Sequence, residues 1–334
     1  MFIVRFLRNN WFVLGLVGAF LCAVLCAQEL RSIDPMGSVR ARIRDLIVVI
    51  IFLAIGSSLP SERILGSMLR PRLYVVTQLT IFVFVPLLMA GFTLVPEWVL
   101  GIQLFPASIT TGLLALSVLP TTGSSCVVFT QAAQGNTIAA TVNSTLSNIV
   151  GVLVSPLLLS LLLNTGGRAL PIDRLVVVLV GLTRQMVLPL LIGQMLRAFL
   201  IRMIRPPDRF LREATSAMIV AVVFLSTGIA LDGGYTVTGD TVSAVLFLLL
   251  FYPSLVAVVA LLARVARLDG SDRSALVFTG THKTLALGIP LLSLYFADQP
   301  DLLSAALTPL IFYHLLQLLF GGLLANAIAR RTAE

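Results

Sequence analysis

Charged side chains are scarce in this chain of 334 residues: Asp, Glu, Lys and Arg make up only 11% of it, and 58% of its residues are hydrophobic. A soluble domain of this length carries about a quarter charged residues. Apolar runs of about 20 residues recur from end to end, which is typical of helices that span a membrane. The composition therefore excludes a soluble globular domain. A transmembrane β-barrel is also excluded, because its segments are short and alternate.

Cysteine is rare as well. Cys22, Cys26 and Cys126 form an odd number and lie in apolar segments, so the sequence predicts neither a disulfide framework nor a metal site. No loop of the type G-x-x-x-x-G-K-S/T is present, so we do not expect the chain to drive transport with ATP by itself. The net charge of +8 comes from arginines that flank apolar runs. This is typical of topology signals and does not indicate a nucleic-acid partner.

The apolar runs predict ten membrane-spanning helices. The run from Trp11 to Ala27 follows Arg5 and Arg8 and has the layout of a signal peptide. The many later runs favour a first transmembrane helix instead. We predict spans at 11–28, 43–59, 72–93, 98–118 continuing with a break to 134, 137–163, 174–200, 211–231, 241–265, 271–297 and 302–328.

Arginines are distributed unevenly over the loops between these spans. With the N-terminus in the cytoplasm, fifteen loop arginines lie on the cytoplasmic side and six on the outer side, as the positive-inside rule favours. The cluster of Arg40, Arg42 and Arg44 is the exception, because it lies outside. We expect a multi-pass protein of the plasma membrane, the inner membrane in a bacterium, with both termini in the cytoplasm.

The two halves of the chain share short patterns. FLAIGSSL (52–59) and FLSTGIAL (224–231) share F-L-x-x-G-x-x-L, and FVPLL (84–88) and FYPSL (251–255) share F-x-P-x-L. The spacing is close to half the chain, which suggests an internal repeat. With five spans in each repeat, the second copy is inserted upside down, an arrangement typical of transporters with a site near the bilayer midplane. We predict a first repeat at 1–165 and an inverted second repeat at 166–334.

Two predicted spans contain residues that interrupt a helix. LPTTGSSCVVFTQAAQGN (119–136) contains Pro120, which removes a helical hydrogen bond, and Gly123, which loosens the backbone. FTGTHKTLALGIP (278–290) contains Gly280, Gly288 and Pro290. Irregular backbone at membrane depth is tolerated only where it is buried in protein or lines a wet cavity. At these two breaks we predict the substrate-binding residues Thr121, Thr122, Gly123, Ser124, Thr281, His282, Lys283 and Thr284.

A polar stretch, TVNSTLSN (141–148), lies between the two breaks in the sequence. Its Asn143, Ser144 and Ser147 fall on neighbouring turns of one helix. Such side chains in membrane helices often serve only to bond one helix to another. Beside a helix break, they favour a binding role.

The segments LPTTGSSCVVFTQAAQGN, TVNSTLSN and GTHKTLALGIPLL resemble the crossing-helix motifs of the bile acid:sodium symporter family. The closer likeness is to its divergent branch, which contains the seventh, orphan mammalian member and bacterial relatives, and it extends over nearly the whole chain. The resemblance implies an all-α polytopic membrane protein of ten helices, with a panel domain (spans 1, 2, 6 and 7) and a core domain (spans 3–5 and 8–10). In the core domain, the fourth and ninth helices would break and cross.

The sodium site of that family is matched only in part. A serine–asparagine pair of the bile acid branch corresponds to Ser125 and Cys126, so the asparagine is lost. On the ninth helix, the family's glutamate position is Phe278 and its Gln-Asn pair is His282 and Lys283. Asp and Glu lie in loops or at span ends, so a sodium site here must rely on neutral oxygens. The resemblance implies a degenerate ion site with the candidate residues Ser125, Cys126, Asn143, Ser144 and Ser147. The coupling ion would be Na⁺ or H⁺, and we expect no other metal or cofactor.

Lys283 is the only lysine in the chain. Ten residues of helix, roughly 15 Å, separate it from Arg273, the nearest loop arginine, so Lys283 is predicted to lie deep in the membrane. A charge there costs about 2.5–3.5 kcal/mol on insertion scales, and such residues are functional candidates. We hypothesise that the Lys283 ammonium stands where relatives hold sodium and helps to hold an anionic substrate. Protonation and anion binding would then be coupled.

Two further polar residues in the spans, His282 and Arg184, have open interpretations. His282 could titrate as a switch or act as a neutral hydrogen-bonding replacement for glutamine. Arg184 could pack against backbone carbonyls or contact a substrate. His314 is expected to pack between helices.

These features predict a secondary active transporter of small amphipathic organic anions that works by alternating access, and not an enzyme. Its partners would be the anion and membrane lipid, and the sequence does not indicate an oligomeric state. One alternative is a transporter-like regulator of ion (calcium) homeostasis. Another is an intramembrane hydrolase with Lys283 as base and Ser124 or Ser125 as nucleophile, although no oxyanion hole or third orienting residue is evident.

Overall fold

The computed structural model describes residues 2–34, 37–58, 71–164, 171–203, 208–232, 239–296 and 299–333, and its regular elements are all helices. The predicted all-α fold is therefore confirmed. Four of the arginines counted above, at 63, 70, 168 and 205, lie outside the described residues. The helices are α1 (Phe2–Leu25), α2 (Ala27–Ile33), α3 (Ser38–Ser58), α5 (Pro71–Leu79), the π-helix η1 (Thr80–Phe84), α6 (Val85–Thr93), α7 (Val95–Leu100), α8 (Ala107–Val118), α9 (Ser125–Ala132), α10 (Thr137–Asn164), α11 (Ile172–Leu182), the π-helix η2 (Thr183–Val187), α12 (Leu188–Met203), α13 (Asp208–Asp232), α14 (Gly239–Val265), α15 (Gly270–Thr281), α16 (Leu285–Tyr295) and α17 (Pro300–Ala333).

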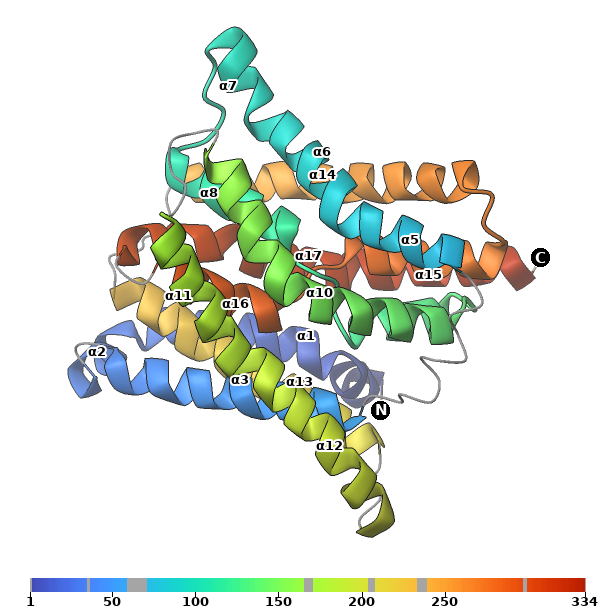
Figure 1. Cartoon of the computed structure of the whole chain (residues 1–334), viewed down its shortest axis with the longest axis horizontal. Coiled ribbons are helices and arrows are strands. Elements are labelled where there is room, and N and C mark those ends of the chain that lie inside the picture. The colour runs from blue at the N-terminus through green and yellow to red at the C-terminus, as the bar shows by residue number, and fades with distance from the viewer. Residues whose placement is uncertain are drawn as a thin grey trace.

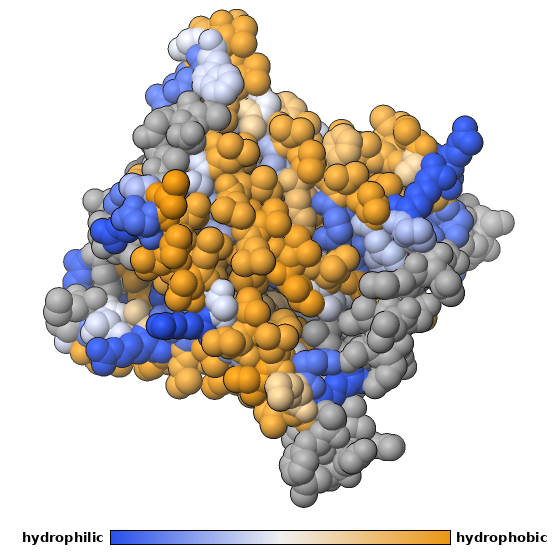
Figure 2. Space-filling view, viewed as in Figure 1, coloured by the Kyte–Doolittle hydropathy of each residue, from blue (hydrophilic) through white to orange (hydrophobic). Residues whose placement is uncertain are grey.

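The described residues contain six helical segments that are long and apolar enough to cross a membrane, or seven if α1 and α2, which meet at 69°, form one bent span. The six are Pro71–Leu100, Thr137–Leu163, Ile172–Arg197, Thr241–Val265, Gly270–Tyr295 and Ala306–Arg330. Figure 2 shows an apolar surface across the middle of one face, with hydrophilic residues gathered mainly towards its left and right edges. The protein is thus a multi-pass helical membrane protein. The predicted total of ten spans stays a prediction, since α8 and the apolar part of α13 are shorter.

The helices pack as two groups, which lie in the lower and upper parts of Figure 1. In the first group, α3 packs extensively against α12 and α13, and α1 packs against α13. In the second group, α8 packs against α6, α10 and α17, while α14 packs against α15 and α17. The two groups meet where α13 contacts α17, where α11 contacts α16 and where α10 contacts α11.

The contact between α3 and α12 depends on two glycines. A Cβ atom on Gly56 would lie 2.1 Å from the carbonyl oxygen of Leu190, and one on Gly193 would lie 2.2 Å from that of Leu53. No side chain larger than hydrogen fits at these separations. Small residues let membrane helices approach to backbone contact, where dispersion forces are strongest.

Both predicted helix breaks are present. The helix α8 ends at Val118, Leu119 is extended with φ −69° and ψ 148°, and α9 begins at Ser125. The helix α15 ends at Thr281, and α16 begins at Leu285 after three residues, of which His282 and Thr284 are extended. The second break lies between the glycines that suggested it, because Gly280 is within α15 and Gly288 is within α16.

The predicted start of the fourth span at residue 98 was wrong. Residues Val95–Leu100 form α7, which closes the preceding segment and ends at Gly101 with a positive φ of 66°. Gly is favoured at this left-handed position because it has no Cβ. The chain then runs without helix to Pro106, and α8 begins at Ala107. The apolar run hid this turn, since its only local signals are the glycine and the proline.

The arginine cluster at the start of α3 is largely engaged within the protein. Arg40 donates from its backbone N–H and its Nε to Asp34, at 2.9 and 3.3 Å. Arg44 forms an ion pair of 2.8 Å with Asp45 and donates to Ser293 on α16 at 3.0 Å. Arg40 and Arg44 are buried, whereas Arg42 is exposed. Two of the three arginines that depart from the positive-inside pattern are therefore held by local partners.

Candidate functional site

Lys283 lies in the extended segment between α15 and α16, and its side chain is buried, with an exposed fraction of 1%. Its Nζ atom donates to the carbonyl oxygens of Ser117 and Leu119, both at 2.7 Å, and to that of Ile81 at 3.3 Å. An ammonium group has three N–H donors and no acceptor. All of its donors are therefore used, and its ligands are backbone carbonyls from the end of α8 and from η1.

The local sequence explains why these carbonyls are free. At the end of α8, the extended Leu119 and the following Pro120 stop the helix, which leaves its last carbonyls without helical partners. In η1, the N–H of Val85 bonds to Thr80, and the next residue is Pro86, which has no N–H to donate. The carbonyl of Ile81 therefore lacks a backbone partner and accepts from Lys283 instead.

The carbonyls of six consecutive residues, 117–122, all accept hydrogen bonds. Those of Ser117 and Leu119 receive Lys283. The others accept from Ser155 Oγ (to Val118, 2.8 Å), Thr284 N (to Pro120, 3.0 Å), Asn148 Nδ2 (to Thr121, 2.9 Å) and Cys126 Sγ (to Thr122, 2.7 Å). Buried carbonyls need such partners. The bond from Thr284 joins the two helix breaks directly, so they form one structural unit.

The backbone of Lys283 is held by a side chain of α17. The Gln317 carboxamide accepts from Lys283 N at 2.6 Å and donates to Lys283 O at 2.9 Å. Gln317 Nε2 also lies 2.6 Å from Nδ1 of His314, which is 3.3 Å from the same carbonyl. The amide of Gln317 thus supplies the backbone with the pairing that the broken helix no longer provides.

Positive charge at this site has no acidic partner in the described part of the chain. No ion pair to Lys283 is present there, and the buried carboxylates are Asp34, before α3, and Asp272, at the far end of α15. The N-termini of α9 and α16 also lie at the two breaks. Helix N-termini carry partial positive charge. Within the described residues, a protonated Lys283 would therefore be stabilised by carbonyl dipoles and by no carboxylate.

The predicted substrate-binding residues differ in access. Gly123 is exposed and Ser124 is partly exposed. The others are buried, namely Thr121, Thr122, Thr281, His282, Lys283 and Thr284. In this conformation, only the loop before α9 offers predicted binding residues to a molecule from outside. Lys283 donates to carbonyls and does not reach that surface.

His282 is enclosed by aromatic rings. Its ring centroid lies 5.5 Å from that of Phe129, 5.9 Å from that of Phe278 and 6.3 Å from that of Tyr252. Its Nδ1 lies 2.8 Å from the carbonyl oxygen of Phe278. The phenol of Tyr313 donates to the carbonyl of Thr281, at 2.5 Å. These contacts fix the chain on entry to the break.

Most of the candidate ion-site residues donate hydrogen bonds to backbone carbonyls within a few residues of them in the sequence. Ser144 and Ser147 donate to carbonyls of their own helix α10, both at 2.9 Å. Asn143 donates to Ala139 O at 3.1 Å and accepts from Gln78 at 3.3 Å. The remaining two lie at the start of α9, where the Ser125 hydroxyl is 2.6 Å from that of Thr122 and the Cys126 thiol donates to the Thr122 carbonyl.

The geometry does not support Ser125 as the nucleophile of a serine–lysine hydrolase. Lys283 Nζ donates to three carbonyls, and the hydroxyl of Ser125 is paired with Thr122. A general base must lie within hydrogen-bond reach of its nucleophile. Arg184, the other mid-span charge, is exposed on η2 and belongs to a different helix group.

Sequence reasoning missed Gln317 and Ile81. A signal for Gln317 was available, because His314 and Gln317 are three residues apart in an otherwise apolar run and so share one helix face. No side-chain signal exists for Ile81, since it contributes only its carbonyl oxygen. The useful signal there is Pro86, five residues later, whose missing N–H frees that oxygen.

Comparisons with known proteins identify the family of the chain. A family model described as the SBF-like CPA transporter family matches residues 10–330. The chain is 30% identical to sodium/bile acid cotransporter 7 of Xenopus tropicalis over 340 residues, covering 96% of this chain and 92% of the relative. It is 28% identical to the mouse protein of the same name, over 96% of this chain and 93% of that one. It is also 29% identical to an uncharacterized protein of Pseudomonas aeruginosa, with 98% and 95% covered. Since the match spans nearly all of it, the chain belongs to the SBF-like CPA transporter family.

Proposed function

We propose that this protein is a secondary transporter that carries small amphipathic organic anions by alternating access, linked to a proton or sodium gradient. The observation that carries this proposal is the buried ammonium of Lys283, which has no acidic partner in the described residues. An electropositive interior attracts anions and repels cations. The relatives named sodium/bile acid cotransporter 7 support a small solute as the substrate.

Within this proposal, Lys283 replaces part of the sodium site of the family. Its three carbonyl ligands form a cage of the kind that broken membrane helices offer to cations. The ammonium would hold the two breaks together, and it would raise the potential at Gly123 and Ser124, where an anion has access. The remaining proposed substrate residues, Thr121, Thr122, Thr281, His282 and Thr284, would become accessible as the protein changes conformation.

The motion that we propose separates the two helix groups. The group of α1, α3, α11–α12 and α13 would be the panel, and the group of α5–α6, α8–α10 and α14–α17 would be the core. Each group takes helices from both of the proposed inverted repeats of five spans, 1–165 and 166–334, and both termini would lie in the cytoplasm. Extensive packing within each group supports movement of each as a unit.

The test is uptake by purified protein in proteoliposomes. Labelled taurocholate and a sulfated steroid are supplied at pH 6 and pH 8, each with sodium and with choline as the only external cation. We expect uptake of at least one anion above that of empty liposomes. Lys283→Met should abolish it, while Arg42→Gln, at an exposed site, should not. No uptake under any condition, or full uptake by Lys283→Met, would refute the proposal. Stabilisation by an anion without any flux would instead support the regulator alternative.

Replacement of the ion by Lys283 has a separate test. Lys283→Ala leaves the cage without its cation, so a small cation in solution should substitute for it. We expect Na⁺ or NH₄⁺ at 200 mM, compared with choline, to raise the thermal midpoint of Lys283→Ala but not that of the wild type. An equal response of both proteins to these cations would contradict the replacement.

A further inference from the structure

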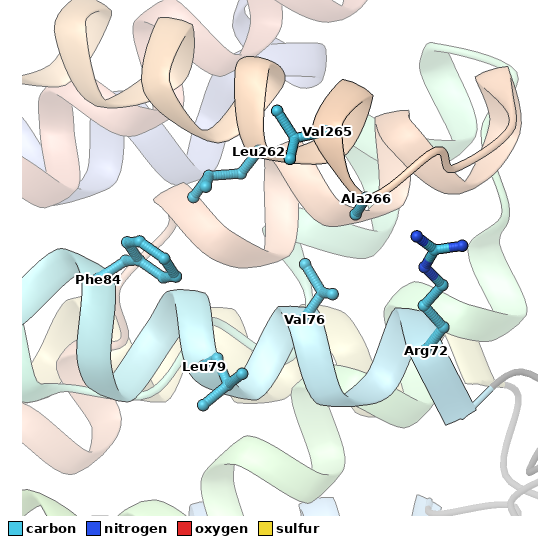
Figure 3. Close-up of a pocket in the computed structure, with 7 residues that line it drawn as sticks. All are labelled: Arg72, Val76, Leu79, Phe84, Leu262, Val265 and Ala266. Atoms are coloured by element: carbon cyan, nitrogen blue, oxygen red, sulfur yellow. The ribbon is translucent and has the colours of Figure 1, made fainter.

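A groove of about 330 Å³ lies outside the two breaks, between α5 with η1 on one side and the last turns of α14 on the other. Six apolar residues and one arginine line it: Val76, Leu79, Phe84, Leu262, Val265, Ala266 and Arg72. Figure 3 shows the side chains of Val76 and Phe84 facing the end of α14 and the Arg72 side chain close to Ala266.

The groove opens on the apolar outer surface of two candidate membrane spans. Leu79, Phe84 and Val265 are 45%, 46% and 70% exposed, and they lie on the spans Pro71–Leu100 and Thr241–Val265. A soluble molecule would not reach this apolar surface without crossing lipid. The natural occupant of an apolar groove between two spans is therefore the acyl chain of a bilayer lipid.

The arginine end of the groove indicates the charge of that lipid. Arg72 is exposed, and so are Arg264 and Arg267, which flank Val265 and Ala266 in the sequence. No ion pair joins these three arginines to a carboxylate in the described residues. The nearest acid along the chain, Asp269, accepts from Asp272 N and from Ser271 Oγ at the start of α15. An apolar groove that ends at Arg72 complements a lipid with an anionic headgroup.

We propose that this groove binds an anionic phospholipid, with one acyl chain along Val76, Leu79, Phe84 and Leu262 and the phosphate against Arg72. Phe84 belongs to η1, the π-helix whose Ile81 carbonyl receives Lys283. A bound chain would pack against η1 and hold that carbonyl in place. The lipid would thus support the carbonyl cage from outside, at a site separate from the substrate site.

The test is lipid retention by the purified full-length protein after delipidation in detergent. Native mass spectrometry measures adducts with palmitoyl-oleoyl phosphatidylglycerol and with palmitoyl-oleoyl phosphatidylcholine at equal concentration. We expect preferential retention of phosphatidylglycerol by the wild type. Loss of one headgroup contact should lower its apparent affinity about fivefold in Arg72→Gln. Arg42→Gln, which removes an exposed arginine from the other helix group, should retain the wild-type preference.

Two further measurements distinguish the contribution of the apolar groove from that of the Arg72 charge. Val76→Trp fills the groove while leaving Arg72 unchanged, and it should lower retention of both lipids. Glycerol 3-phosphate, which carries the phosphate without acyl chains, should not displace phosphatidylglycerol. Wild-type retention by both Arg72→Gln and Val76→Trp would overturn the proposal, as would full displacement by glycerol 3-phosphate.

Discussion

The guanidinium of Arg44, on α3, donates a hydrogen bond of 3.0 Å to the hydroxyl of Ser293, on α16. The two residues belong to different helix groups, and the Arg44 side chain is buried. The same guanidinium is held by Asp45 at 2.8 Å. A motion that separates the groups at this end of the protein must break the bond to Ser293.

A crosslink between these positions should therefore stop transport. The pair Arg44→Cys and Ser293→Cys, in a background with Cys22 and Cys26 replaced by serine, is joined with a short bis-methanethiosulfonate. We expect proteoliposome uptake to fall to background and to return after reduction, because the groups can then move again. As the control, Arg42→Cys with Ser293→Cys should stay active, since Arg42 is exposed. Undiminished uptake by the crosslinked pair would contradict the proposed motion.

Gln317→Leu should destabilise the protein strongly. It removes the partners of the Lys283 N–H and carbonyl, and each buried group left unpaired costs about 1–3 kcal/mol. The thermal midpoint in detergent measures the effect. Gln131→Leu, at an exposed position on α9, should change it little. Equal midpoints for the two variants would show that the amide pairing does not stabilise the break.

Gly193→Ala should separate α3 from α12. The new Cβ atom would meet the Leu53 carbonyl oxygen at 2.2 Å, so the backbones must move apart, at a cost of about 1–3 kcal/mol. Gly91→Ala is the matched control, because nothing lies within 4 Å of a Cβ there. In that variant, the better helix propensity of alanine should leave stability unchanged or raise it slightly. Comparable thermal midpoints for the two variants would argue against close helix contact.

Stability should also depend on pH through Asp34. Hydrogen bonds from the backbone N–H and the guanidinium of Arg40 hold the pKa of this carboxyl below its ordinary value of 3.8. A carboxylate with a lowered pKa stabilises the folded state above the unfolded-state pKa, and the effect is lost as pH falls through the folded-state pKa. Asp34→Asn should therefore lower the thermal midpoint at pH 7, and the difference from the wild type should shrink below about pH 4. A difference that stays constant from pH 7 to pH 3 would exclude this origin.

The helical class and the two breaks could be predicted from the sequence because their causes are local. Long apolar runs require helices in a membrane. Pro120 favours the end of α8, since a proline has no N–H to continue the ladder. Proline alone does not decide a break, because Pro290 lies inside α16. The family could likewise be identified from the segments around the two breaks.

The partners of Lys283 could not be predicted, since they come from distant parts of the chain. Ile81 and Ser117 are 202 and 166 residues away from it, and they bind through backbone oxygens that every residue carries. Gln317 is 34 residues away and acts through the backbone of Lys283. Side-chain patterns report which groups are present, but they do not reveal which carbonyls remain free after folding.

Because the Lys283 ammonium is part of the chain, the protein does not need to take up this cation from the medium. An ion that binds from solution fills its site according to its concentration, so the site empties when that ion is scarce. An amine on the chain itself is always present at a fixed, high local concentration beside the oxygens of Ser117 and Leu119. The hydrogen bonds from Lys283 that join one broken helix to the other thus do not depend on the salt concentration outside the cell.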